Sequence, residues 1–271
     1  SGKSDLAFQI AEKLDGTIIN ADAIQVFSNW RILTARPSAE DEAKIKHKLY
    51  GHVDGDSDYS VGTWLKQIKK ILSDTSKPII VGGTGLYFSA LSEGLVGIPD
   101  IPKKIRFEAN SRISENGLES LAKEIDKATA RNIDLNNPRR VQRAWEVLIS
   151  TGRGLHSWHN EKSKPILNLN QCKTILVDGD ISSFNKRITK RFDQMMEQGL
   201  IREGENNLEN WNETFPSSKA IGARELIAHL QNKITVDELK EQILIATRQY
   251  AKRQRTWFRS KMKTWEKHII N

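Results

Sequence analysis

Short runs of aliphatic residues alternate with longer amphipathic segments along this chain, and this alternation restricts the folds that are open to it. Residues 17–20, 78–81 and 174–177 are rich in isoleucine and valine and have the length of buried strands. Apolar residues recur with helical spacing over 5–14, 60–73, 103–128, 138–151, 181–199, 219–231 and 236–263. Strands that alternate with helices favour a parallel sheet covered by helices, so we predict an α/β fold.

The helical segments exceed what a small sheet requires. Strand-like sequence stops near Gly97 and returns only near residue 173. We therefore predict a helical insertion over 103–171, between two parts of an α/β core, 1–102 and 172–271. The polar segment 201–217 is expected to be a connector, and residues 267–270 are expected to form a strand at a sheet edge.

The composition limits the compartment and the partners. The chain has 271 residues, a formal net charge of +8 and one cysteine, Cys172, which has no second cysteine to pair with. It contains no apolar stretch of about 18 residues and no recognisable secretory signal, so we expect a cytoplasmic protein without a membrane span. The excess of basic residues favours a polyanionic partner such as nucleic acid.

The tetrapeptide Ser1-Gly2-Lys3-Ser4 stands directly before a helical segment and matches the second half of a phosphate-binding loop. In such a loop the amides at the helix N-terminus and the lysine bind phosphate oxygens, and the following hydroxyl binds Mg²⁺. The glycine-rich first half of the loop is not in this sequence, and we expect the natural chain to begin before Ser1. The alternative is a Ser-Gly turn that only caps a helix.

Polar groups follow two of the predicted strands. Asp22 comes after residues 17–20, and Gly82-Gly83-Thr84-Gly85 comes after residues 78–81. The carboxyl ends of parallel strands meet at one edge, where open α/β sheets bind ligands. Asp22 is therefore a candidate general base or metal ligand, and Thr84 offers a hydroxyl at the same edge. Helix capping by Asp22 and a plain strand-to-helix turn at the glycines are the alternatives.

Two predicted helices are strongly basic. Arg139, Arg140 and Arg143 follow Pro138, and apolar residues between them provide a separate buried face. From Arg248 to Lys267, arginine and lysine are interleaved with aromatic residues. On a helix, four of these cations share one face, namely Arg248, Lys252, Arg255 and Arg259. Guanidinium groups suit phosphates, although a solvated helix face is the simpler interpretation of any basic run.

Several segments together resemble one family, the tRNA dimethylallyltransferases, in the same order along almost the whole chain. The most specific is the run TRQYAKRQRTWFR at residues 247–259. The others are residues 1–4, 20–27, 34–37, 47–49, 59–61, 81–87, 137–144 and 220–225. The chain departs from the family pattern at Arg36, where lysine is commoner, and at Ala223, where an aromatic residue is usual. No Cys/His tail follows, so the resemblance is to bacterial members.

The resemblance implies a P-loop NTPase-like core that transfers a dimethylallyl group from dimethylallyl diphosphate to N6 of adenosine 37, beside the tRNA anticodon. Asp22 would accept the proton from N6, and Thr84 and Arg106 would line the channel to the adenine. Mg²⁺ would be the cofactor and would bind Ser4. The diphosphate would be held by the phosphate loop, that is by Ser1, Gly2, Lys3 and Ser4.

The resemblance also implies a tRNA-binding surface that grips the anticodon arm, and we expect a monomer. Cations would contact phosphates, and Trp257 either stacks on a splayed base or packs in the core. The predicted surface is drawn from four segments: Asp22, Ala23, Ile24 and Gln25; Arg139, Arg140, Val141, Gln142 and Arg143; Lys219, Ala220, Ile221, Gly222, Ala223 and Arg224; and Lys252, Arg253, Gln254, Arg255, Thr256, Trp257, Phe258 and Arg259.

Three alternatives stay open at this point. A P-loop small-molecule kinase shares the phosphate loop and the arginine-bearing helix, but it would turn over ATP. An adenylate isopentenyltransferase acts on free AMP or ATP and does not need the basic C-terminal segment. A non-catalytic RNA-binding protein does not need Lys3, Asp22 and Thr84 at the edge of a sheet.

Overall fold

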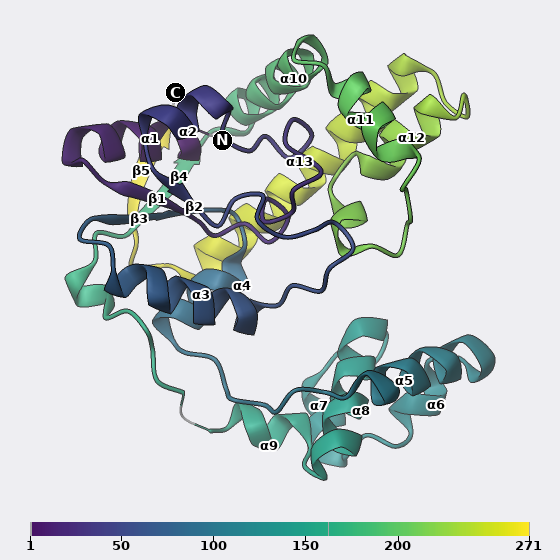
Figure 1. Ribbon diagram of the computed structural model, residues 1–271. Helices are drawn as coiled ribbons and strands as arrows, with labels where there is room; N and C mark the ends of the chain where they lie inside the picture. The colour runs from purple at the N-terminus through teal and green to yellow at the C-terminus, as the bar shows by residue number, and fades with distance from the viewer. Residues whose placement is uncertain (1, 162, 271) are drawn as a thin grey trace. The chain divides into compact units, whose positions relative to one another are not determined.

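The computed structural model describes residues 2–161 and 163–270 and divides into two compact units (Figure 1). One unit combines the chain up to Ser92 with the chain from Ile166 onward, and the other is Glu93–Pro165. The second unit begins and ends earlier than the predicted insertion, 103–171. Ile166 and Leu167 belong to the first unit because they pack against the apolar cluster around Trp64 and Tyr87.

The first unit is built on a small parallel sheet of three strands. β1 (Thr17–Asn20) lies in the centre, between β2 (His47–Lys48) and β3 (Pro78–Val81). Both neighbours run parallel to β1, which confirms the mixed α/β fold with a parallel sheet. All three strands therefore end at the same edge of the sheet.

The two faces of this sheet pack against different helices, because neighbouring side chains on a strand point to opposite sides. Ile18 packs with Ala7 and Ala11 of α1 (Lys3–Leu14). Ile19 packs on the other side with Trp64 of α3 (Val61–Ser73) and Tyr87 of α4 (Gly85–Ser92). The sheet is thus the middle layer of three.

A second parallel pair joins distant parts of the chain. β4 (Ile175–Gly179) pairs with β5 (Glu266–Ile270), with Ile175 opposite Glu266. The strands predicted near residues 174–177 and 267–270 are therefore present. They form a sheet of their own and do not extend the three-stranded sheet.

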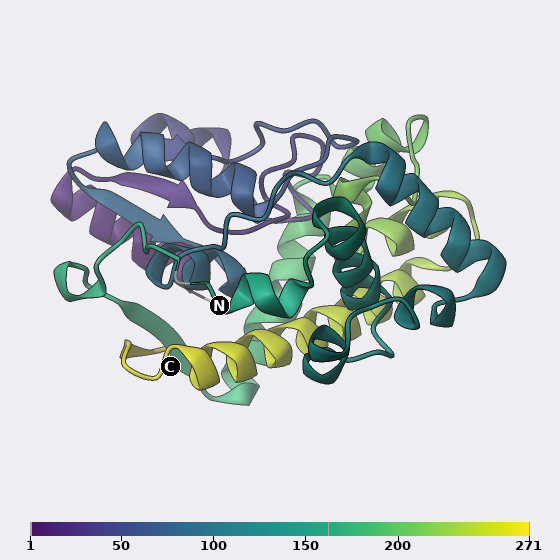
Figure 2. The same cartoon turned by 90° about the horizontal axis from the view of Figure 1, so that it is seen from below.

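Four helices complete the first unit: α10 (Ile181–Glu197), α11 (Leu200–Leu208), α12 (Ala223–Leu230) and α13 (Val236–Lys261). They share one core with Trp30 and Leu33 from the loop after β1. Figure 2 shows α13 as one continuous helix that ends close to the C-terminus.

The prediction of a connector at 201–217 was wrong, because α11 occupies residues 200–208. Glycine and asparagine weaken the helical signal there. The helix forms because Leu200 is fully buried and Gly204 lets α12 approach closely. A Cβ at Gly204 would lie 2.8 Å from Leu226 and Leu230.

The second unit is all helical: α5 (Lys103–Asn116), α6 (Glu119–Ala122), α7 (Lys127–Asn132), α8 (Pro138–Thr151) and α9 (Leu155–His159). Its core is centred on Leu121, Val141 and Trp145. The prediction of one helix over 103–128 was wrong, because Gly117 has φ 74° and ends α5. The predicted bounds of α8 are confirmed.

The remaining short elements are α2 (Ala39–Lys44) and two 3₁₀ helices, Leu169–Gln171 and Pro216–Lys219. The helix predicted from residue 219 begins instead at Ala223, after Gly222 with φ 92°. Within residues 2–161 and 163–270, no helix has both the length and the apolar character needed to cross a membrane.

Candidate functional site

Asp22 follows β1 and is fixed by the side chain of Asn20. The Asn20 amide is fully buried and donates to the carbonyl oxygens of Asp22 at 3.0 Å and Leu49 at 2.9 Å. Its oxygen accepts the backbone N–H of Asp22 at 2.8 Å. The indole of Trp64 donates to the Asn20 carbonyl at 2.8 Å. The ends of β1 and β2 are therefore tied together around Asp22.

The segment after β3 is joined to the same loop. The Thr84 hydroxyl accepts the N–H of Ala23 at 2.9 Å, and the Thr84 N–H donates to the Ala21 carbonyl at 3.2 Å. Gly82 permits this approach, since a Cβ there would lie 2.1 Å from the Ala21 carbonyl. The structure thus brings Asp22 and Thr84 together at one edge of the sheet, where the strand pattern places them.

The C-terminal helix α13 packs directly against this glycine-rich segment. Gln254 donates from Nε2 to the Gly83 carbonyl at 2.9 Å. A Cβ at Gly83 would lie 2.1 Å from that nitrogen, and a Cβ at Gly85 would lie 2.3 Å from the Trp257 ring. These two glycines therefore make room for the protein's own side chains. The interpretation of Trp257 as a packing residue agrees with this contact.

Lys3 and Arg191 lie within electrostatic reach of Asp22, and a further cation, Arg187, lies near Gly2. Desolvation lowers the pKa of Lys3, the opposite charge of Asp22 counteracts this, and Arg191 lowers it further. Desolvation also lowers the pKa of Arg191, against the opposing effects of Asp22 and Asp5. Arg187 lies one turn earlier on α10, with Nη1 3.6 Å from where a Cβ of Gly2 would be. Neither arginine was among the predicted site residues, although their spacing of four places them on one face of a predicted helix.

Three tyrosines lie within electrostatic reach of Asp22. Burial raises the pKa of Tyr50, Tyr87 and Tyr250, and the negative charge of Asp22 adds to the increase in each case. A hydrogen bond with Gln254 partly opposes the increase at Tyr250. These phenols keep their protons at neutral pH and provide rings and donors around the carboxylate.

The N-terminus of α1 has the features of an anion site. Its N-cap residue, Gly2, makes no side-chain capping bond, so the first-turn amides are not occupied by a cap. Ser4 lies in this first turn and is exposed. Ser1 lies outside the described residues. In the part of the chain that the structure describes, no group of three or more His, Cys, Asp or Glu could hold a metal.

The predicted residues of the second unit form a separate group. Arg106 on α5 and Arg139 and Arg140 on α8 are exposed. Burial lowers the pKa of Arg143, Glu146 opposes this, and Arg106 adds to the lowering, so Arg106 and Arg143 are neighbours.

One predicted tRNA contact in this unit needs correction, and another side chain bonds within the protein. Val141 has no exposed surface, because it lies in the core of the unit. Gln142 donates to Glu146 and to Asn110, at 2.9 Å in each case. The Val141 side chain therefore cannot contact RNA, whereas Gln142 is half-exposed and its contact with tRNA stays a prediction.

The predicted tRNA contacts of the first unit divide in a similar way. Lys219, Arg224, Lys252, Arg253 and Thr256 are exposed. Ile24 packs against the core around Trp30, and Ile221 is half-buried. Three predicted contacts have buried side chains that cannot reach RNA, namely Ala220, Ala223 and Phe258. Gly222 is buried as well.

Four further predicted contacts are engaged within the protein. Gln25 donates from Nε2 to the carbonyls of Thr34 and Ala35, and Gln254 is bound to Gly83. The Arg255 guanidinium lies 5.4 Å from the centre of the Phe184 ring. Arg259 donates from Nε and Nη2 to both carboxylate oxygens of Asp178 and holds the pKa of that carboxyl below its usual value. The α13 cations are thus only in part available to a polyanion.

Comparison with known proteins agrees with this arrangement. The sequence pattern of the IPP transferase family matches residues 25–261. A tRNA dimethylallyltransferase of Cereibacter sphaeroides (strain KD131) is 50% identical over 265 residues, which cover 98% of this chain and 84% of the relative. A tRNA dimethylallyltransferase of Ruegeria sp. (strain TM1040) is 47% identical over 267 residues, covering 98% and 91%.

Solved structures are similar over nearly the whole chain. A tRNA isopentenylpyrophosphate transferase from Bacillus halodurans has a TM-score of 0.68 at 29% identity, covering 99% of this chain and 86% of that protein. A eukaryotic dimethylallyltransferase that acts on tRNA has a TM-score of 0.77 at 27% identity, covering 95% and 67%.

The bonds of Asn20 lead to a first prediction. The change Asn20→Ala leaves the Leu49 carbonyl and the Asp22 N–H without their partner, at a cost of about 1–3 kcal/mol for each buried group left unsatisfied. We expect the midpoint of urea unfolding to fall accordingly. The exposed Asn210→Ala is the control and should leave the midpoint unchanged. Equal midpoints for the two variants would show that Asn20 does not hold this loop.

Proposed function

This chain belongs to the IPP transferase family, and we propose that it transfers a dimethylallyl group from dimethylallyl diphosphate to N6 of adenosine 37 in tRNA. One observation carries the proposal. A carboxylate, Asp22, stands at the end of the central strand, and its negative charge reaches Lys3 and Arg191, where it opposes the lowering of both pKa values by desolvation. Such a site offers a base for an amine and cations for a diphosphate. The names of the relatives support the choice of substrates.

The cations would act on the leaving group. As the allylic C–O bond breaks, the bonding electron pair goes to the diphosphate, whose negative charge must be stabilised. Lys3 and Arg191 would supply positive charge, and the first-turn amides of α1 would donate hydrogen bonds. The Thr84 hydroxyl accepts from Ala23, so its own proton stays available for a diphosphate oxygen.

The carboxylate would act on the acceptor. The N6 amine of adenine attacks the allylic carbon, a C–N bond forms, and Asp22 takes the proton that nitrogen loses. The adenine must leave the stack of anticodon bases to reach Asp22, at a cost of roughly a few kcal/mol. The assignment of Arg106 to the channel, which the family resemblance implies, stays a prediction.

We include Mg²⁺ in the proposal because the site offers a donor oxygen that suits this ion. A magnesium ion is typically held by one or two protein oxygens together with substrate phosphates, and the exposed hydroxyl of Ser4 at the start of α1 fits this role. When bound, the ion would supply positive charge to the departing diphosphate. The P-loop NTPase-like core is part of the same proposal. Its support is a parallel sheet together with a Gly-Lys-Ser sequence that opens α1.

The cellular setting follows from the proposed acceptor. We place the activity in the cytoplasm because the reaction requires tRNA. The monomeric state expected from the sequence stays a prediction. A kinase or an adenylate isopentenyltransferase would differ in acceptor. Assays with AMP and ATP in place of tRNA separate these activities.

The first test concerns the base. We expect Asp22→Asn to lower the rate of prenyl transfer by about 10²–10⁴, because the amide cannot accept the N6 proton. The measurement is mass spectrometry of tRNA digests after timed incubation with dimethylallyl diphosphate and Mg²⁺. Asp56→Asn, at an exposed carboxylate, is the control. A wild-type rate for Asp22→Asn, with tRNA affinity retained, would reduce Asp22 to a capping residue.

The second test concerns Arg191. We expect Arg191→Gln to raise KM for dimethylallyl diphosphate by about tenfold or more, since a hydrogen bond to a charged group contributes about 1.5–3 kcal/mol. The affinity for tRNA should stay close to that of the wild type. Arg202→Gln, at an exposed position of α11, removes the same charge elsewhere. If both variants had the same KM, Arg191 would have no part in diphosphate binding.

A further inference from the structure

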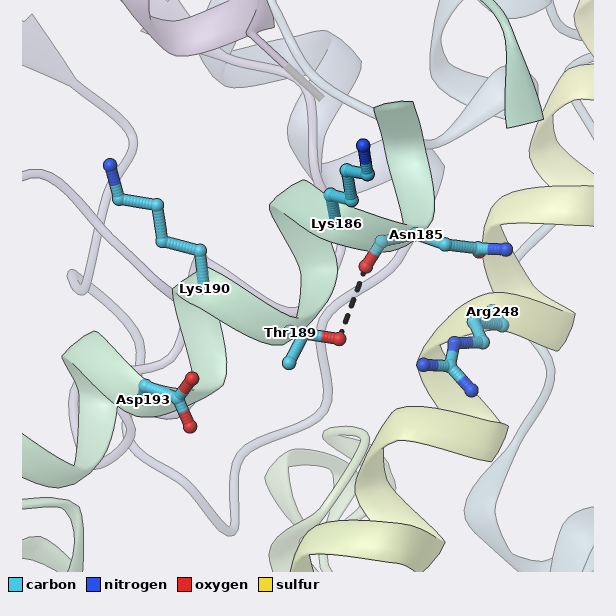
Figure 3. Close-up of a pocket in the computed structure, with 6 residues that line it drawn as sticks. All are labelled: Asn185, Lys186, Thr189, Lys190, Asp193 and Arg248. Carbon is cyan, nitrogen blue, oxygen red and sulfur yellow. Dashed lines mark hydrogen bonds between the residues drawn. The ribbon is translucent and has the colours of Figure 1, made fainter. Parts of the chain in front are cut away.

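An open groove lies between α10 and α13 in the first unit. Its volume is about 490 Å³. α10 lines it with five residues spaced along one helix face, and α13 contributes one side chain that is turned toward α10 (Figure 3). The lining residues are Asn185, Lys186, Thr189, Lys190, Asp193 and Arg248.

The groove carries an excess of positive charge. Its single carboxylate, Asp193, accepts from Lys240 Nζ at 2.7 Å, so its charge is already matched by a lysine outside the lining. Lys186, Lys190 and Arg248 are exposed. Among residues 2–161 and 163–270, none of these three forms an ion pair with a carboxylate.

The cations of α13 that are available to a polyanion differ from those that the sequence pattern predicts. The sequence pattern places Arg248, Lys252, Arg255 and Arg259 on one RNA-binding face. In the structure, Arg259 is bound to Asp178, and Arg255 lies over the Phe184 ring. Arg248 instead lines the groove together with Lys186 and Lys190 of α10. No sequence motif marks these two lysines.

α10 presents cations on two different faces. Lys186 and Lys190 are one turn apart and line the groove. Arg187 and Arg191 are also one turn apart, but they are rotated by about 100° from the lysines and lie toward Gly2 and Asp22. The groove is therefore separate from the cluster of cations around the carboxylate.

We propose that this groove binds the phosphate backbone of the substrate tRNA, away from the nucleotide that reacts. The inference rests on the proposed function, because it assigns a further contact surface to the same substrate. The cations are spread along the groove and do not converge on one point, as they would for a small anion. Lysines suit single phosphate contacts, and the Asn185 amide offers a donor for phosphate or sugar oxygens. The Thr189 hydroxyl donates to the Asn185 backbone carbonyl at 3.2 Å (Figure 3).

The lining argues against an acidic membrane as the partner. Membrane-surface helices combine basic residues with apolar side chains that enter the lipid. All six residues that line this groove are polar or charged. Salt-dependent phosphate contacts are what such a surface provides.

The experiment compares two triple variants. Lys186→Ala/Lys190→Ala/Arg248→Ala removes the groove cations, and Lys66→Ala/Lys69→Ala/Lys70→Ala removes three exposed cations from α3. The dissociation constant for unmodified tRNA is measured by filter binding over a series of KCl concentrations. We expect the groove variant to bind about tenfold or more weakly, with a slope of log K against log[salt] smaller by roughly two to three units. The α3 variant should keep the wild-type slope.

Two results would overturn the inference: a wild-type slope for the groove variant, or an equal loss of slope in the α3 variant. A single substitution at an exposed site, Lys190→Glu, provides a second variant whose folding is not in question. It should weaken binding more than Lys190→Gln does, and equal binding by these two would also count against the groove.

Failure of the inference can be separated from failure of the proposed function. Prenyl transfer by the wild-type chain is measured on the same tRNA preparation. If transfer occurs but the groove variant binds like the wild type, only the groove assignment fails. If the groove variant loses slope as expected but the wild type transfers no prenyl group, only the proposed reaction fails.

Discussion

The buried amide of Asn20 is the interaction on which the rest of the site depends. It forms hydrogen bonds with the backbone of Asp22 and of Leu49, and so joins the ends of two parallel strands. The Asn20 side chain itself is fully buried. A buried amide without partners would be costly, so the loop has one favourable arrangement. Thr84 adds the end of the third strand through Ala23. The carboxylate is therefore positioned by the sheet itself and does not depend on a mobile loop, which is the geometry that proton transfer requires.

The helices that flank this edge of the sheet differ in the charged residues that they contribute. The N-terminus of α1, Lys3 and Arg191 concentrate positive charge next to a single carboxylate, and the tyrosines around that carboxylate stay neutral. An excess of cations suits a diphosphate better than it suits a neutral ligand. A different face of α10, rotated by about 100°, carries the groove cations. One helix thus contributes to both polyanionic partners of the proposed reaction, through residues that differ by a single position in the sequence.

Much of the fold was predictable, because local signals were strong where elements are regular. Two strands, Thr17–Asn20 and Pro78–Val81, have their predicted bounds, and Asn137, Pro138 and Gly152 mark the limits of α8. The prediction failed at Gly117, which divides a long helical pattern, and at Gly204, where tertiary packing overrides weak helix propensity.

The site was predictable only in part, for a related reason. Asp22 and Thr84 could be placed because strand ends share an edge. The pairing of Arg259 with Asp178, and that of Gln254 with Gly83, joins residues far apart in the chain, and periodicity within one helix carries no information about either. Both side chains were therefore predicted to bind tRNA, although the fold uses them to hold α13 in place. Arg187 and Arg191 were missed because their partners come from the start of the chain.

We propose that this edge of the sheet transfers the dimethylallyl group of dimethylallyl diphosphate to an adenine of tRNA and releases diphosphate. The most direct measurement incubates the wild-type chain with isotope-labelled dimethylallyl diphosphate, Mg²⁺ and an equimolar mixture of tRNA and AMP. Digestion and mass spectrometry then locate the label. We expect label on N6 of the adenosine next to the anticodon and none on AMP. Label found on AMP alone would contradict it.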